Sequence, residues 1–149
     1  MAPNLKDMYR DGAAHALGGF QLLEEALKAY IDLYYRAANQ LLRGQLHFGH
    51  QRADVQDSPL GRLLTVFSKI CANQELLAEM RALLKHRDQA AHQAFICLYG
   101  PGPDDQTLTS MTDANVKLAT QLGDLFPRLQ AETLKVVAVM ANDKKKGGG

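Results

Sequence analysis

The sequence predicts an all-α protein: an up-and-down four-helix bundle in which one helix is short. Apolar residues recur at three- and four-residue spacing along most of the chain, which is the pattern of helices that bury one face. Runs of alternating β-branched residues are missing, and no Asn-Gly or Asp-Gly turn stands between two such runs. With 149 residues, 46% of them hydrophobic, the chain is long enough to bury one core without disulfides.

Two long helices are expected toward the two ends of the chain. The first covers about residues 5–43, and Gly12, Gly18 and Gly19 predict a break or bend in its first part. The fourth covers about residues 112–141, where Pro127 predicts a kink. We expect residues 1–141 to form a single domain, and residues 142–149, which end in three lysines and three glycines, to form a disordered tail.

Two shorter helices are expected between the long ones. A polar loop at 44–57 joins them to the first helix, and a loop at 104–110 joins them to the fourth. Residues 59–71 form the short one, because Ser58 suits the N-cap and Pro59 suits the first helical position. Residues 74–99 form the third helix, which Asn73 can cap. The run Gly-Pro-Gly-Pro that begins at Gly100 ends this helix.

The third helix contains the strongest conflict between polarity and pattern. Nine apolar residues fall within one arc of about 120° when successive residues are placed 100° apart: Leu76, Leu77, Met80, Leu83, Leu84, Ala91, Ala94, Phe95 and Leu98. Arg87 falls near the middle of that arc. An arginine in a core-facing position is costly unless it is paired or lines a cavity or interface, so this position is a candidate functional site.

Asp88 and His92 follow Arg87 at a spacing that suits a catalytic histidine. Residues four apart share a helix face, so the Asp88 carboxylate can reach the His92 imidazole and orient it. Such a contact would raise the pKa of His92.

The run from Arg87 to His92, Arg-Asp-Gln-Ala-Ala-His, resembles the Arg-x4-6-His motif of HEPN domains, which are small helical bundles found in toxin–antitoxin, abortive-infection and CRISPR effector proteins. The approach to the motif is also similar: Pro59 opens a short helix, and Asn73 opens the longer one that leads to Arg87. The resemblance extends over about residues 15–140 in helix order and over about 58–95 in residue detail. Asparagine is the more familiar residue after the arginine, and aspartate here adds a negative charge.

The resemblance implies a metal-independent endoribonuclease, with no cofactor and no metal, that cuts RNA by attack of the 2′-hydroxyl. His92 would act in acid–base chemistry, Arg87 would stabilise the phosphorane, and Asp88 would orient the imidazole. Lys85 and His86 would bind flanking RNA phosphates. A toxin or defence effector of this kind would have an antitoxin or another regulatory protein as a partner.

The expected geometry also predicts a homodimer. Arg87 and His92 lie about 140° apart around an ideal helix, so one copy does not easily aim both at one phosphate. Two copies across a two-fold axis would bring two arginines and two histidines into a composite cleft, as HEPN domains are known to do.

Several alternatives remain open at this stage. The chain can be a non-catalytic HEPN-like regulatory or interaction protein, or a helical subunit that binds a partner helix. Arg10 with His15 and Arg43 with His50 match the same motif, but neither pair is embedded in an apolar arc. His15 can still face the same pocket as His92.

Composition and the remaining motifs limit other function classes. A formal net charge of +1 argues against a non-specific nucleic-acid coat. Cys71 and Cys97 are expected to be reduced core residues, and His47 and His50 lack further ligands for a metal. With neither a signal peptide nor a membrane span in the sequence, we expect a cytoplasmic protein without membrane contact.

Overall fold

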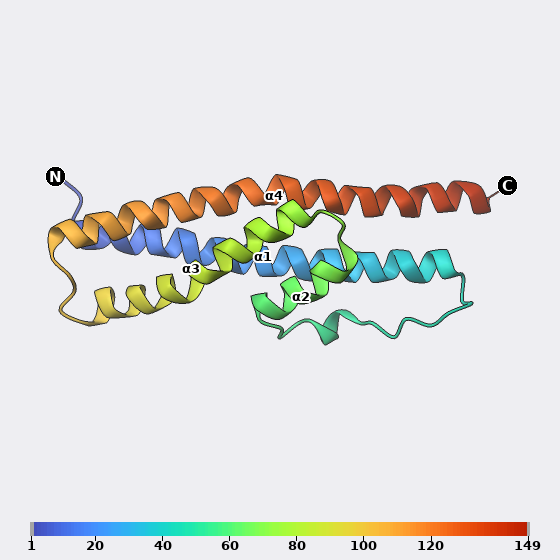
Figure 1. Ribbon diagram of the computed structural model, residues 1–149, viewed down its shortest axis with the longest axis horizontal. Coiled ribbons are helices and arrows are strands. Elements are labelled where there is room, and N and C mark those ends of the chain that lie inside the picture. The colour runs from blue at the N-terminus through green and yellow to red at the C-terminus, as the bar shows by residue number, and fades with distance from the viewer. Residues whose placement is uncertain (1, 149) are drawn as a thin grey trace.

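The protein is all-helical, as the sequence predicts. The computed structural model describes residues 2–148, which form α1 (Leu5–Leu42), the 3-10 helix η1 (Arg52–Asp54), α2 (Leu60–Ile70), α3 (Gln74–Tyr99) and α4 (Asp105–Gly147) (Figure 1). No strand occurs within these residues. None of the helices in this range combines the length and the apolar run that a membrane span requires.

The long helices α1 and α4 run parallel, side by side, in a constant register (Figure 1). Gly12 lies against Asn115, Gly19 lies against Leu122, and Gln40 donates to Asp143, so each pair is separated by 103 residues in the sequence. The α1 positions are separated by multiples of seven, which is the repeat of helices that pack as in a coiled coil. Five of the buried residues of α1 are also spaced seven apart: Tyr9, Ala16, Leu23, Tyr30 and Ala37.

The predicted break at the α1 glycines is wrong, because α1 is continuous from Leu5 to Leu42. Two of the three glycines lie at the contact with α4: a Cβ on Gly12 would lie 3.6 Å from Asn115 Cβ, and one on Gly19 would lie 3.0 Å from Leu122 Cδ1. Their low helix propensity costs about 1 kcal/mol each, which helix packing offsets. Gly12 and Gly19 therefore allow a close approach of two helices and do not break α1.

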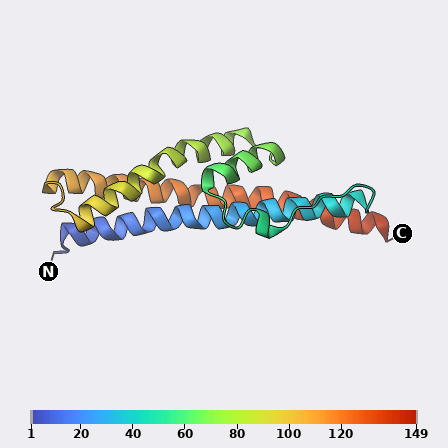
Figure 2. The ribbon, with the colours of Figure 1, turned by 90° about the horizontal axis from the view of Figure 1, so that it is seen from below.

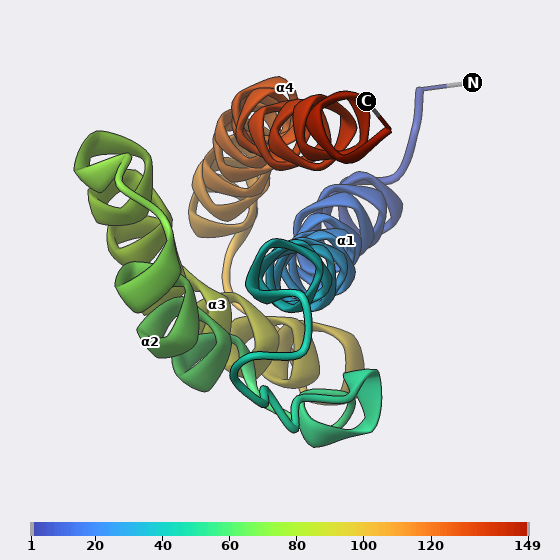
Figure 3. The ribbon, with the colours of Figure 1, turned by 90° about the vertical axis from the view of Figure 1, so that its right-hand side faces the viewer.

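The helices α2 and α3 cover one face of the α1–α4 pair (Figures 2 and 3). The helix α3 runs antiparallel to α1, because Arg87 contacts Glu24 while Cys97, later in α3, packs with Tyr9, earlier in α1. The main core joins all four helices around Phe20, Leu64 and other large side chains. A second, smaller cluster joins the N-terminal part of α1 to the C-terminal part of α3.

Helix ends in α2 and α3 follow the predicted boundaries closely, whereas those of α4 do not. The helix α3 has the predicted bounds, and the Asn73 side chain accepts a hydrogen bond from Leu76 N at 3.1 Å. The helix α4 begins at Asp105, where a loop up to residue 110 was expected, because Asp104 caps it by accepting from Thr107 N at 2.7 Å. The helix then continues through Pro127.

The C-terminal residues 142–147 belong to α4 instead of a disordered tail. Asp143 explains the extension, because it lies against the end of α1. Its carboxylate accepts from Gln40 Nε2 at 3.1 Å and from Arg43 Nη2 at 3.0 Å. These hydrogen bonds lower the pKa of Asp143 below its ordinary value, so the charged carboxylate is the form that holds the two helix ends together.

Candidate functional site

Arg87 forms an ion pair with α1 instead of facing an open cleft. Its Nη2 lies 2.9 Å from Glu24 Oε1, and the side chains of Arg87 and Glu24 are 32% and 16% exposed. Glu24 Oε1 is buried and accepts no aligned hydrogen bond, so the contact is one of opposite charges at close range rather than a directed N–H···O bond. Arg87 thus has the paired environment that a half-buried arginine requires.

The buried face of α3 changes along the helix, and part of the predicted core is wrong. Leu76, Leu77, Met80 and Leu83 are buried as expected, whereas Ala91 and Phe95 are exposed. Ala94 is also buried as expected, and Ala90 and Cys97, which lie outside the predicted arc, are buried as well. Around an ideal helix, Ala90 and Cys97 lie about 20° and 40° beyond the Leu83 edge of that arc, on the side away from Phe95. The buried face therefore turns gradually as α3 leaves the main core and enters the cluster around Tyr9.

This turn leaves one side of α3 uncovered. The outer face of α3 consists of Asp88, Ala91, His92, Phe95 and Tyr99, all of them exposed and all within an arc of about 100°. The Phe95 and Tyr99 side chains are 66% and 81% exposed, and their ring centroids lie 5.4 Å apart. Large aromatic side chains at such exposure are typical of a contact surface rather than of a finished core.

The predicted site residues are not drawn into one pocket within a single copy. Asp88 and His92 share the outer face of α3, but no hydrogen bond or ion pair between them occurs within residues 2–148. Lys85 is exposed. His86 lines a groove between α3 and α4 of about 480 Å³, which it shares with Gln89, Gln93 and Lys117.

His15 lies on a different side of the molecule. It lines a shallow groove of about 300 Å³ between α1 and α4, together with Gly12 and Val116. Its Nδ1 lies 2.9 Å from the carbonyl oxygen of Asp11, one turn earlier in α1. Neither His15 nor His92 lines the groove that contains His86.

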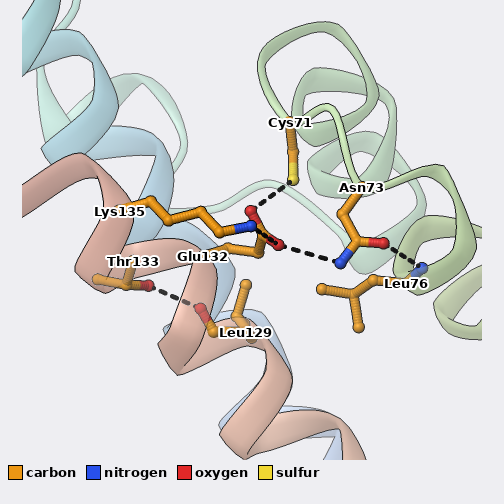
Figure 4. A network of polar contacts seen from close by, with 7 residues as sticks. All are labelled: Cys71, Asn73, Leu76, Leu129, Glu132, Thr133 and Lys135. Carbon is orange, nitrogen blue, oxygen red and sulfur yellow. Dashed lines mark hydrogen bonds and ion pairs between the residues drawn. The ribbon is translucent and has the colours of Figure 1, made fainter. Parts of the chain in front are cut away.

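A buried polar cluster that the sequence analysis missed joins α4 to the turn between α2 and α3 (Figure 4). Glu132 of α4 accepts from Asn73 Nδ2 at 3.0 Å, from Lys135 Nζ at 2.9 Å and from Cys71 Sγ at 3.8 Å. The Glu132 residue is only 7% exposed. Its position was recognisable, because Leu125, Leu129 and Val136 place it on the apolar stripe of its helix, just as Arg87 interrupts the predicted stripe of α3.

The electrostatics of this cluster indicate an anchor rather than a reactive centre. Burial alone would raise the pKa of Glu132, but the hydrogen bonds from Lys135 and Asn73 outweigh it, so the pKa is lowered. Burial raises the pKa of the Cys71 thiol and of the Tyr30 hydroxyl. A thiol that stays protonated is a poor nucleophile. The cluster therefore fixes the turn at Asn73 and with it the start of α3.

Metal ligands do not gather anywhere in the part of the chain that the structure describes: no group of three His, Cys, Asp or Glu side chains there is arranged to hold an ion. His50, which the sequence offered as one half of a histidine pair, stacks on Tyr35 with centroids 4.4 Å apart. Cys71 and Cys97 are buried and free.

Comparison with known proteins adds no further constraint. No family model matches the chain, and neither a curated protein nor a solved structure matches it.

Proposed function

We propose that this chain is a non-catalytic, HEPN-like helical interaction protein that binds a partner through the outer face of α3. The observation that carries the proposal is the uncovered pair Phe95 and Tyr99, next to His92 on the same side of the helix. Aromatic side chains supply most of the energy in such surfaces, since they bury a large area with few rotatable bonds. An amphipathic helix with apolar anchors at three- and four-residue spacing is the kind of partner that fits this face.

The environment of Arg87 favours binding over catalysis. A guanidinium that stabilises a phosphorane must be free to bind phosphate oxygens as negative charge develops. In this chain Glu24 already occupies a position 2.9 Å from Arg87 Nη2, so a phosphate would have to displace a carboxylate. His92 lies about 140° around the helix from Arg87, on the exposed side.

Affinity capture with the full chain tests this function. Wild type and Phe95→Glu are used as baits in a lysate of the source organism, and any captured protein is then purified and titrated against both baits. We expect a purified partner to bind wild type and to lose at least about tenfold in affinity with Phe95→Glu. Equal binding of both baits would contradict a role for this face. Leu22→Glu, on an equally exposed leucine of α1, is the matched control and should bind as wild type does.

A second candidate is the metal-independent endoribonuclease that the HEPN resemblance implies. The observation in its favour is a short cationic segment of α3, in which exposed Lys85 and His86 precede Arg87, whose side chain keeps 32% of its surface accessible. A homodimer formed through the outer face of α3 would bring two such segments together with two His92 rings. RNA would then be the substrate, and an antitoxin or another regulatory protein would be the partner of a toxin or defence effector.

An RNA cleavage assay separates the two candidates. Purified protein is incubated with total RNA in the presence of EDTA, with His92→Ala, Arg87→Ala and His15→Ala beside wild type. For the interaction protein we expect no cleavage by any of them. Cleavage by wild type and His15→Ala that both α3 variants abolish would establish the nuclease and refute the non-catalytic assignment.

A further inference from the structure

The α1–α4 pair carries an uncovered apolar face on the side opposite α2 and α3. His15 of α1 and Val116 and Ala119 of α4 line a groove on this side. Leu22 comes seven residues after His15, and Leu134 and Val137 come five full helical turns after Val116 and Ala119, so these three residues lie on the same side of their helices. Leu22, Val116 and Leu134 are 63%, 54% and 58% exposed, although all three are large and apolar. Figure 3 shows α2 and α3 on one side of the pair and no helix on the other.

On α4 this face is a continuous stripe of residues at helical spacing and does not consist of isolated apolar residues. From Val116 to Ala141, the residues at three- and four-residue steps on this side of α4 are all uncharged. The buried side of α4 holds Leu122 and Leu129, and its charged side holds Asp124 and Lys117. The helix α4 therefore has a buried apolar side and an uncharged side, with the large apolar residues Val116, Leu134 and Val137, that no other helix within residues 2–148 covers (Figure 3).

The total exposed surface is larger than that of a compact monomer of the same mass. The chain exposes 9422 Å², whereas a compact monomer of 16.4 kDa exposes about 7500 Å². The excess is about 1900 Å². The side of the α1–α4 pair that α2 and α3 leave uncovered (Figure 3) contributes to this excess.

We infer that the uncovered face of the α1–α4 pair binds the same face of a second copy of this chain. The area fits: 38 residues of α1 give a strip about 57 Å long. At a width of about 15 Å, this strip covers about 850 Å², close to the roughly 800 Å² that each partner buries in a stable dimer.

Charge also favours a second copy as the occupant. In a two-fold dimer the same surface of both copies is in contact, and residues near the axis lie against their own counterparts. Charged residues at the centre of the surface would therefore meet like charges. The centre of this face is uncharged, and the charged residues Asp11 and Asp113 lie beside it, as in interfaces with an apolar centre and a polar rim. The small side chain of Ala119, with the neighbouring Gly123, lets the helices of the two copies approach closely.

This dimer is distinct from one built on α3. The outer face of α3 would stay free in it, so a partner bound there and a second copy bound to α1–α4 would not compete. The two surfaces can therefore be tested separately. A result that contradicts partner binding through α3 does not contradict dimerisation through α1–α4, and the reverse also holds.

Sedimentation equilibrium of the full chain tests the proposal. We expect wild type to be a dimer at micromolar concentration, and Leu22→Glu and Val116→Glu each to raise the dimer dissociation constant at least about 100-fold, because a buried, unpaired carboxylate is introduced twice per dimer. Both positions are exposed in the monomer and glutamate is a good helix former, so circular dichroism should show unchanged helix content.

Phe95→Glu is the matched control, because Phe95 is as exposed as Leu22 and lies on α3. It should leave the dimer intact. The inference is overturned if wild type is monomeric at about 100 μM, a concentration at which a standard-size interface is populated. It is overturned equally if Phe95→Glu dissociates the dimer while Leu22→Glu does not, or if neither substitution changes it.

Discussion

Gly19 of α1 lies so close to Leu122 of α4 that a Cβ built on Gly19 would be 3.0 Å from Leu122 Cδ1 and 3.4 Å from Leu122 Cβ. The neighbouring Gly18 has no atom within 4 Å of the corresponding position. Two adjacent glycines in one helix thus have different roles: Gly19 sets the distance between α1 and α4, and Gly18 makes no such contact.

Alanine substitutions at these glycines should therefore have different effects on stability. Gly18→Ala should raise the free energy of unfolding by about 0.5–1 kcal/mol, because alanine has the higher helix propensity and restricts the unfolded chain. Gly19→Ala should leave the free energy of unfolding unchanged or lower it by about 1 kcal/mol, because Leu122 must move to admit the methyl group. Urea denaturation of both variants measures the difference. Equal stabilisation by the two would mean that α1 and α4 are not in close contact at Gly19.

The ion pair between Arg87 and Glu24 should be a measurable coupling between α3 and α1. A double-mutant cycle with Arg87→Ala and Glu24→Ala should give a coupling free energy of about 1 kcal/mol. This value is at the upper end for surface ion pairs, because both side chains are partly shielded from solvent. The exposed pair of Arg10 and Asp7, whose side chains are 58% and 53% exposed, is the control and should couple close to zero. A coupling at Arg87 no larger than in the control would remove the structural explanation for this arginine.

Glu132 should make the protein sensitive to acid. Because its pKa in the folded state is lowered, the unfolded chain binds more protons as the pH falls, and the contribution of Glu132 to stability is lost on acidification. That contribution is complete above the unfolded value of about 4.3 and disappears as the pH drops through the lower folded pKa. Glu132→Gln should therefore be less stable than wild type near pH 7, and the gap should narrow below about pH 4.

Denaturant midpoints measured at several pH values give this profile. Glu75→Gln, at an exposed position in the first turn of α3, is the control and should follow the wild-type curve more closely than Glu132→Gln does. A constant gap between wild type and Glu132→Gln at all pH values would show that the Glu132 carboxylate contributes nothing to the acid response.

Asp143 should hold the last turns of α4 in place. Asp143→Ala removes the acceptor of two side chains at the end of α1, so amide hydrogen exchange should become faster from about residue 140 onward while the centre of α4 stays protected. We expect a small loss in the free energy of unfolding, because two hydrogen bonds at the helix end are removed. Asp124→Ala, at an exposed position in the middle of α4, is the control and should leave the exchange of the C-terminal amides unchanged.

Much of the fold followed from local patterns in the sequence. Periodicity located all four helices, and the bounds of α3 followed from Asn73 and from the glycine and proline after Tyr99, because caps and helix-breaking residues act over a few neighbouring positions. The sequence also singled out Arg87 as a polar residue that needs a partner.

Only the tertiary structure decided what these residues contact. The partner of Arg87 is 63 positions earlier, the acceptor for Asn73 is 59 positions later, and the register of α1 with α4 joins residues 103 apart. A periodic stripe reports which side of a helix is apolar, but it does not report which neighbour covers that side or whether any does. For that reason Phe95, which fits the apolar stripe of α3, lies exposed where α3 turns another face to the core. Likewise Gly12 and Gly19, which suggested a break in α1, lie at its close contact with α4.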